Sequence, residues 1–285
     1  MNPFGVILDF LKLLREVLSL VVDFRDSFRR EAQRIITAFK AHGVQPNDVA
    51  SFMPVGLIDE PSLFERPDTL KPYLNKVTPW TAEVLQIDLA WLKGRSLKPH
   101  RDIGVHGAFE LLEFLNSQTH FGSFFGRFTL YVFKSDDRPI HMSAGGFSVV
   151  LEEHFKDLDG NEEHGVYRYF HVSRGAYFEH PGCLLHLMCI LALAHVHKIQ
   201  VWGRVMDRSR LIKLDDGNGF IPELWRDRVA KHWYPEDAIW TGLGSPADWV
   251  LKWRPELDHA LVRAGMNSIA EVVQQDRKRL ERGAL

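Results

Sequence analysis

The chain has 285 residues, of which 45% are hydrophobic and 25% are charged, which excludes a largely disordered protein and is typical of one large or two modest globular domains. The formal net charge of −2 gives no overall attraction for a polyanion, so a surface that binds nucleic acid would have to be a local patch. The two cysteines exclude a disulfide framework and predict a reducing, cytoplasmic setting.

Residues 6–28 carry apolar side chains in steps of three and four, which is typical of an amphipathic helix. A strict seven-residue repeat runs through them, at Ile7, Leu14, Val21 and Phe28. Such a repeat suits a helix–helix seam, either against the rest of the chain or in a homodimer through residues 7–28. Because charged residues such as Asp9 and Lys12 interrupt the segment, we expect no signal peptide, no transmembrane span and no membrane partner.

Short helices with clear start and stop signals follow, up to residue 96. Ser27 is expected to cap a helix that ends before Gly43, and Pro46 is expected to open the next one. A further helix is predicted over residues 78–85, and Asp88 is expected to cap a last short one. The sequence therefore predicts an all-α unit over residues 1–96.

Two stretches of this unit resemble the Cro/C1-type helix-turn-helix family. One is His42-Gly43-Val44 with the following Asn47-Asp48-Val49-Ala50, and the other is Val-Leu-Gln-Ile-Asp-Leu-Ala-Trp-Leu-Lys-Gly over residues 84–94. The resemblance covers roughly residues 30–94, and it implies a unit that binds double-stranded DNA. Arginines would then contact phosphates, and the polar residues that follow would approach bases. The candidate DNA-binding residues are Arg29, Arg30, Arg34, Gln45, Asn47 and Ser51. The alternatives are a helical unit that does not bind DNA and a solvated arginine face paired with neighbouring acids.

Residues 97–118 are expected to form a linker with one amphipathic helix, and the composition then shifts to Phe, Tyr, Val and Gly. Strands are predicted over residues 128–133, 146–151 and 166–172, because β-branched and aromatic residues alternate there. Asp159-Gly160 supplies a turn between the second and third strands.

The longest apolar run, Cys183–Val196, is rich in Leu, Met and Ala and predicts a buried helix, and Lys198–Met206 then alternates as a strand does. A short edge strand is expected over residues 211–214. The order of the elements implies an antiparallel sheet with the buried helix across one face. Residues 222–285 are rich in Trp and predict a helical covering layer. The predicted fold is therefore α+β, with residues 119–285 as the second domain.

One face of the third predicted strand, with Tyr167, Tyr169 and His171, is either half core and half surface or, on an open sheet, a platform for a flat ligand. Polar residues just beyond the strand could anchor a small molecule or a protein at the end of the sheet. The candidate ligand-binding residues are Tyr167, Tyr169, His171, Arg174, Tyr177 and His180.

Imidazole and thiolate groups, which are good zinc ligands, occur in two places. Cys183, His186 and Cys189 are three residues apart, and each step of three turns a helical side chain by about 60° backwards, so at most two could share an ion. His195 and His197 lie where the helix is expected to pass into the strand, with no carboxylate near in sequence. We therefore predict no metal site and no cofactor.

Acidic turns over residues 157–163 and 215–219 lack the ligand pattern of a calcium loop and are expected to be solvated. A nucleophile with an obvious base is not recognisable, so no catalytic residue is predicted.

Together, these features predict a cytoplasmic regulatory protein with a DNA-binding helical unit and an α+β domain that senses a ligand or binds a partner. The first alternative is a non-catalytic assembly protein that uses the N-terminal helix. The second is a metal-dependent enzyme of unrecognised family whose site gathers His171, Arg174, His180, His195 and His197.

Overall fold

The computed structural model describes residues 27–58, 60–105, 107–118, 126–138, 140–141, 144–158, 161–225, 231–240 and 248–282. It divides the chain into two compact units, Met1–Ser96 and Leu97–Leu285. Apart from its last two residues, the helix predicted over residues 6–28 lies outside the described part, and its homodimer seam therefore stays a prediction. Within the described part of the chain, no helix is both long enough and apolar enough to cross a bilayer.

The first described helix of the first unit covers residues 27–41, buries Ile35 and Phe39 and stops before Gly43, whose φ is 77°. A left-handed residue at this position is a common helix stop, as the glycine predicts. The next helix, α2 (Pro46–Val49), is a single turn. It is followed by η1 (Pro61–Glu65), α3 (Pro67–Leu70), η2 (Lys71–Tyr73), α4 (Leu74–Leu85) and α5 (Leu89–Leu92).

The start of α4 differs from the prediction, because the helix begins at Leu74 and Pro79 lies inside it. Proline removes one bond to the carbonyl four residues earlier, and here that carbonyl belongs to Asn75, an exposed residue of the first turn. Leu74 and Val77 are buried, so the apolar face extends further towards the N-terminus than the proline suggested. Asp88 caps α5 as predicted, since its Oδ1 accepts from the Trp91 backbone N–H at 2.8 Å.

The second unit is built on a six-stranded sheet with the order β1-β4-β3-β2-β5-β6. The strands are β1 (Arg101–Asp102), β2 (Phe128–Lys134), β3 (Gly146–Leu158), β4 (Asn161–Tyr177), β5 (Gln200–Val205) and β6 (His232–Trp233). The α+β fold is confirmed, but the sheet is mixed: β2 pairs with β5 and β1 with β4 in parallel, and the other pairs are antiparallel. The cause is the helix between β4 and β5, which carries the chain across one face and returns it parallel to β2.

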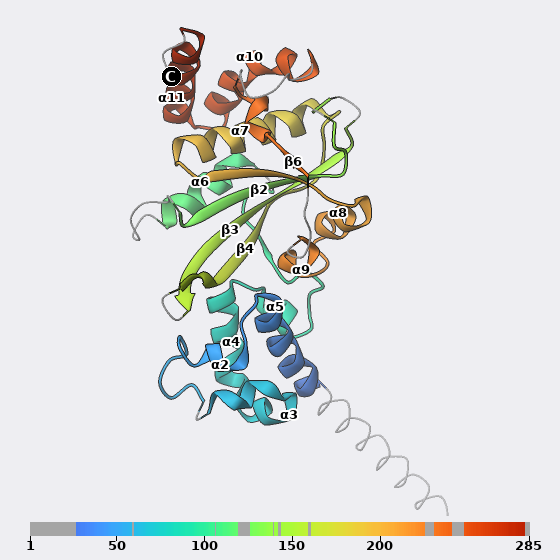
Figure 1. Cartoon of the computed structure of the whole chain (residues 1–285), viewed down its shortest axis with the longest axis vertical. Helices are drawn as coiled ribbons and strands as arrows, with labels where there is room; N and C mark the ends of the chain where they lie inside the picture. The colour runs from blue at the N-terminus through green and yellow to red at the C-terminus, as the bar shows by residue number, and fades with distance from the viewer. Residues whose placement is uncertain are drawn as a thin grey trace, which may run out of the picture. The chain divides into compact units, whose positions relative to one another are not determined.

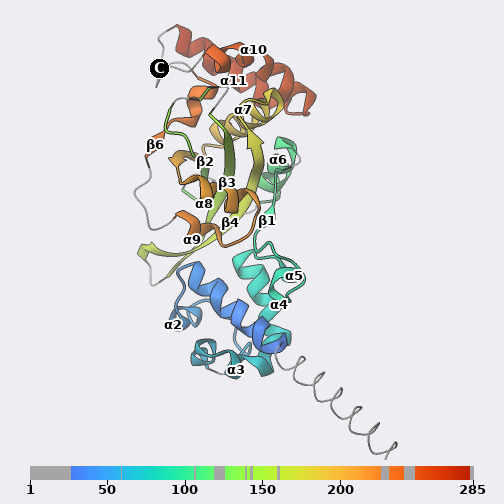
Figure 2. The ribbon, with the colours of Figure 1, turned by 90° about the vertical axis from the view of Figure 1, so that its right-hand side faces the viewer.

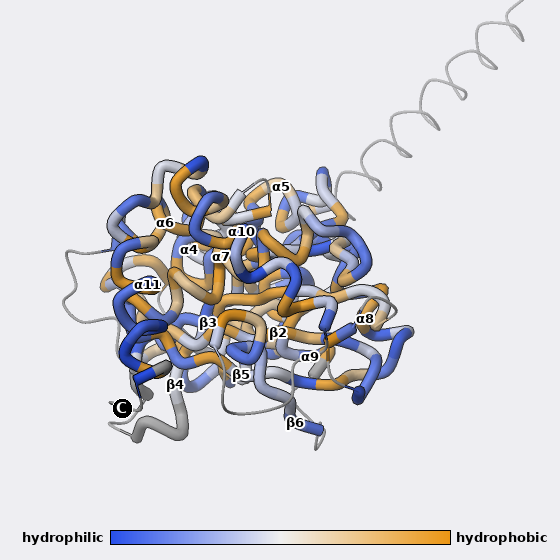
Figure 3. Tube along the Cα trace, turned by 90° about the horizontal axis from the view of Figure 1, so that it is seen from above, coloured by the Kyte–Doolittle hydropathy of each residue, from blue (hydrophilic) through white to orange (hydrophobic). Residues whose placement is uncertain are grey.

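That helix, α7 (Pro181–Val196), is the buried helix that the sequence predicts, and the trace along it is coloured as hydrophobic in Figure 3. It lies over one face of the sheet with α6 (Ala108–Ser117), and α10 (Asp248–Arg263) and α11 (Asn267–Glu281) pack on it from outside (Figures 1 and 2). Trp233, Trp240, Trp249 and Trp253 pack against the same core, as expected of a Trp-rich layer.

The other face of the sheet is covered by α8 (Arg208–Asp215) and α9 (Ile221–Trp225), as Figures 1 and 2 show. The prediction of a strand over residues 211–214 is therefore wrong. Leu211 and Leu214 are both buried against Tyr131 and Phe133 of β2, which requires the three-residue spacing of a helix face. A run of four residues is too short to distinguish that spacing from the alternation of a strand.

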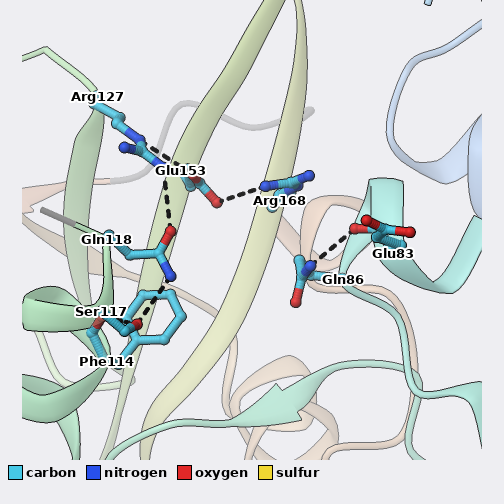
Figure 4. A network of polar contacts seen from close by, with 8 residues as sticks. All are labelled: Glu83, Gln86, Phe114, Ser117, Gln118, Arg127, Glu153 and Arg168. Carbon is cyan, nitrogen blue, oxygen red and sulfur yellow. Dashed lines mark hydrogen bonds and ion pairs between the residues drawn. The ribbon is translucent and has the colours of Figure 1, made fainter. Parts of the chain in front are cut away.

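A buried carboxylate on β3 joins that strand to β4 and to the residue before β2, away from the pocket described below. Glu153 of β3 is 1% exposed and lies between Arg127, which precedes β2, and Arg168 of β4 (Figure 4). Its Oε1 accepts from Arg127 Nε at 3.1 Å, and its Oε2 accepts from Arg168 Nη1 at 3.4 Å. Arg127 also donates to Gln118 at 3.3 Å, so the charge is neutralised and its partners are held in place.

Candidate ligand-binding site

A pocket of about 690 Å³ opens at the carboxyl ends of β2 and β5, beside the start of β3 and the end of β4. Its charged lining comes from segments far apart in the sequence: Asp136, Asp137, Arg208, Asp215 and Lys231. Charges of both signs that converge on one concavity are typical of a site for a polar small molecule.

Two of the three carboxylates are already paired with cations. Asp136 accepts from Arg138 Nε at 3.0 Å, and the Arg138 guanidinium beside it lowers the pKa of this carboxyl. Asp137 lies 2.6 Å from Lys231 Nζ, although both side chains are more than half exposed, so this ion pair contributes little to stability. A ligand therefore need not supply a positive charge to either of these two carboxylates.

Asp215, the last residue of α8, is held differently. Its Oδ1 accepts from the Ser148 hydroxyl and from the Gly175 backbone N–H at 3.1 Å, both of which are neutral donors. Its other oxygen, Oδ2, has no hydrogen bond within the described part of the chain. Burial raises the pKa of Asp215, while the Ser148 hydrogen bond lowers it. The pocket therefore contains a fixed carboxylate with one oxygen still available.

The backbone at Asp215 is fixed by a second layer of contacts. Arg174 donates to the Asp215 carbonyl at 3.4 Å and forms a two-pronged ion pair with Asp102 of β1, at 2.9 and 2.6 Å. Arg174, a predicted ligand-binding residue, therefore does not line the pocket but holds the backbone of Asp215, which does. The planar guanidinium suits that task because it bonds to both oxygens of Asp102 and reaches α8 as well.

Apolar and small residues complete the pocket. Gly145, just before β3, and Gly146, its first residue, line the pocket, and the φ of 80° at Gly145 is a conformation that favours glycine. Tyr177 and Ile212 also line it and are 50% and 51% exposed. Because glycines leave the backbone bare, a ligand can approach the main chain closely here while it covers the tyrosine and isoleucine side chains.

The predicted ligand-binding residues do not form a single site. Tyr177 lines the pocket, but Tyr169 and His171 are at most 1% exposed, so they form no open platform. Tyr167 is partly buried and stacks on His154 at a centroid distance of 5.0 Å. His180 caps α7, since its Nδ1 accepts from the Cys183 backbone N–H at 3.3 Å. Only Tyr177 of this group faces the pocket, and Arg174 supports it.

The predicted DNA-binding residues also differ in their surroundings. Gln45, Asn47 and Ser51 are exposed at or beside α2, and Arg29 and Arg30 are exposed on the first helix. Arg34 is engaged elsewhere, because its guanidinium lies 5.7 Å from the centroid of the Trp91 ring.

The histidine and cysteine clusters form no metal centre in the described part, where no group of three or more His, Cys, Asp or Glu side chains could hold an ion. Burial raises the pKa of Cys189 to about 12, which makes it a poor thiolate ligand. His195 lies in the last turn of α7 and His197 is its C-cap, and His195 Nε2 lies 3.0 Å from Asp276 Oδ2.

Sequence reasoning missed the charged residues of the pocket. Asp215 was expected in a solvated turn, but its partners Ser148 and Gly175 are 67 and 40 residues away. The available signals were weak: Asp136-Asp137 shortly after one predicted strand and Gly145-Gly146 at the start of the next. Comparison of the chain with protein-family models, curated proteins and solved structures found no match.

Proposed function

We propose that this chain is a regulatory protein whose 97–285 unit binds a small polar molecule in the pocket at the carboxyl ends of β2 and β5. The arrangement of Asp215 carries the proposal. A carboxylate that is fixed on one oxygen by Ser148 and Gly175 and left open on the other is prepared to receive a hydrogen-bond donor. Ser148 is fully buried and donates to this acid, so it is a support for the site and not a reacting group.

A pair of bulky substitutions on α8 tests this function. Ile212 lines the pocket, whereas the neighbouring Lys213 is exposed and does not. Thermal unfolding is followed for the wild type, Ile212→Trp and Lys213→Trp against a set of polar metabolites. We expect at least one compound to raise the Tm of the wild type and of Lys213→Trp, but not of Ile212→Trp. A set that stabilises none of the proteins, or all three equally, contradicts the proposal.

We also propose that the first unit contacts double-stranded DNA. The observation in favour is the exposure of Gln45, Asn47 and Ser51 around α2, together with Arg29 and Arg30 on the preceding helix. Arg29 lies 3.9 Å from Asp68, but both side chains are 61% exposed, so this weak pair is open to exchange for a phosphate. Arg34 is left out of the proposed contact set because it packs on Trp91.

The salt dependence of binding tests the DNA contact. Fluorescence anisotropy with duplex DNA is measured at several salt concentrations for the wild type and the Arg29→Ala/Arg30→Ala variant. Each lost phosphate contact lowers the slope of log K against log salt by about 1, so we expect a reduction of about 2. The control, Lys93→Ala/Arg95→Ala, removes two exposed cations elsewhere in the unit. An equal effect in this control, or no binding at low salt, argues against the proposal.

A further inference from the structure

Two charges in the pocket have no ionic partner within the described part of the chain. One is Asp215, which receives only neutral donors on Oδ1. Burial raises its pKa, and the nearby Arg174 charge, which lowers it, already forms an ion pair with Asp102. The other is Arg208, an exposed residue that lines the same pocket. Every other charged group of the lining is satisfied, since Asp136 pairs with Arg138 and Asp137 pairs with Lys231. A ligand that neutralises what is left carries one positive and one negative group.

The spacing of these two charges sets the length of the ligand. Arg208 and Asp215 are the first and last residues of α8, seven positions apart, which places them on one face of the helix about 10 Å apart along its axis. Ile212 lies between them on the helix and also lines the pocket. The surface between the two charges is therefore partly apolar and longer than a single amino acid.

We propose that the ligand is a short zwitterionic chain, a peptide of a few residues, with its ammonium group on Asp215 and its carboxylate on Arg208. This inference rests on the proposed ligand-binding function and names the chemical class of the ligand. Side chains of the peptide contact Ile212 and Tyr177, whose exposed surfaces are otherwise left to water.

Charge favours this class over phosphorylated ligands. When the two ion pairs are left out, the described lining keeps one carboxylate, Asp215, and one cation, Arg208, so a doubly charged phosphate would find one cation to bind and one carboxylate that repels it. The half-buried site of Asp215 favours an ammonium group in turn, because a cation at Oδ2 offsets the cost of burying the carboxylate. The bare backbone at Gly145 and Gly146 leaves room for a peptide main chain.

Calorimetric titration of the full chain with three probes tests the class. Trialanine carries both charges, N-acetyl-trialanine lacks the ammonium group, and trialanine amide lacks the carboxylate. We expect trialanine to bind at least about tenfold more tightly than either blocked peptide, since each loses one charge-assisted contact.

Two variants assign each end of the peptide. In Asp215→Asn, which keeps an oxygen for Ser148 and Gly175, we expect acetylation to make no further difference; in Arg208→Gln, we expect amidation to make none. The matched controls are Asp216→Asn and Lys213→Gln, which change the same charges on residues outside the lining. Both controls should keep the full preference for free trialanine. Because Arg208 is exposed, we expect Arg208→Gln to fold, and it tests the proposal even if Asp215→Asn fails to fold.

The outcomes separate the ligand class from the function. If none of the three peptides binds, or if all three bind equally, the zwitterion proposal is overturned. The same holds if the control variants lose the preference as much as the pocket variants do. The ligand-binding function is then judged by the Ile212→Trp and Lys213→Trp pair alone, and it stands if that pair distinguishes any other compound.

Discussion

His171 of β4 is 1% exposed, and neither of its ring nitrogens has a hydrogen-bond partner within the described residues. Burial, opposed by the nearby Asp102 charge, lowers its pKa to about 4. The imidazole is therefore neutral in the folded protein at pH 7, and its ring packs near that of His100 at a centroid distance of 6.3 Å. Because the folded protein keeps this imidazole neutral, the stability of the unit depends on pH.

We predict that the free energy of unfolding falls as the pH is lowered from 7 to 5. The folded pKa of His171 lies below the unfolded value of about 6.5, so the unfolded chain binds the extra proton between these values, and stability present above pH 6.5 is lost on the way down to pH 4. The expected contribution between pH 7 and pH 5 is about 2 kcal/mol. In urea unfolding, the pH dependence of the unfolding free energy should be smaller by this amount in His171→Gln. It should be unchanged in His259→Gln, because His259 is exposed. An unchanged pH dependence in His171→Gln would show that another group is responsible.

Glu153 supports a second prediction at this scale. Replacement by Ala leaves Arg127 and Arg168, which have only 17% and 12% of their side chains exposed, without the carboxylate between them. Removing one partner from a buried ion pair costs about 3–5 kcal/mol. We expect a loss of this size in urea unfolding of Glu153→Ala, against less than about 0.5 kcal/mol for Glu113→Ala on the exposed side of α6. Equal losses in the two variants would contradict the network shown in Figure 4.

The same residues show where sequence reasoning ended. The partners of Glu153 and Asp215 are 15 to 67 residues away, and local patterns carry no information on such pairs. Tyr169 and His171 alternate correctly on β4, yet both contact the ring of His100, on which Phe220 packs in turn, and the strand itself cannot reveal this cover. Residue types and alternation were predictable, and burial was not.

At the scale of elements, long signals were reliable and short ones were not. The change from Leu, Met and Ala to alternating β-formers predicted both α7 and β5, because sixteen residues of helix leave little ambiguity. Only residues 211–214 of the eight-residue α8 were predicted, and they were predicted as a strand, since Leu211 and Leu214 alone fit either period. The parallel pairing of β2 with β5 depends on the path of α7, which strand order along the chain does not specify.

Because α7 lies between the sheet and the outer helices, truncation inside it should be costly. Leu187 is fully buried, and Leu187→Ala leaves a cavity with no solvent-exposed side through which it can relax. We expect a loss of about 2–5 kcal/mol in unfolding free energy. Leu251→Ala on α10 is the control, since Leu251 is 43% exposed, and it should cost less than about 1 kcal/mol. Similar losses for the two substitutions would argue against the buried position of α7.

At the scale of the molecule, each unit has its own core. In the first, the rings of Phe39 and Trp80 contact each other, and both contact the rings of Phe52 and Phe64, at centroid distances of 5.4 to 6.3 Å. In the second, all members of the two apolar clusters on the faces of the sheet come from residues 103–273. A unit that draws its whole core from its own residues does not need the rest of the chain to bury it.

A fragment of residues 97–285 should therefore fold alone. We expect its circular dichroism to show the helices and strands of the second unit, and its thermal unfolding to coincide with one transition of the full chain. If a compound that distinguishes Ile212→Trp from Lys213→Trp is found, it should raise the Tm of the fragment as much as that transition, because every residue of the pocket lining lies within the fragment. A fragment that stays unfolded contradicts the independence of the second core, and a folded fragment without the ligand effect contradicts the position of the site.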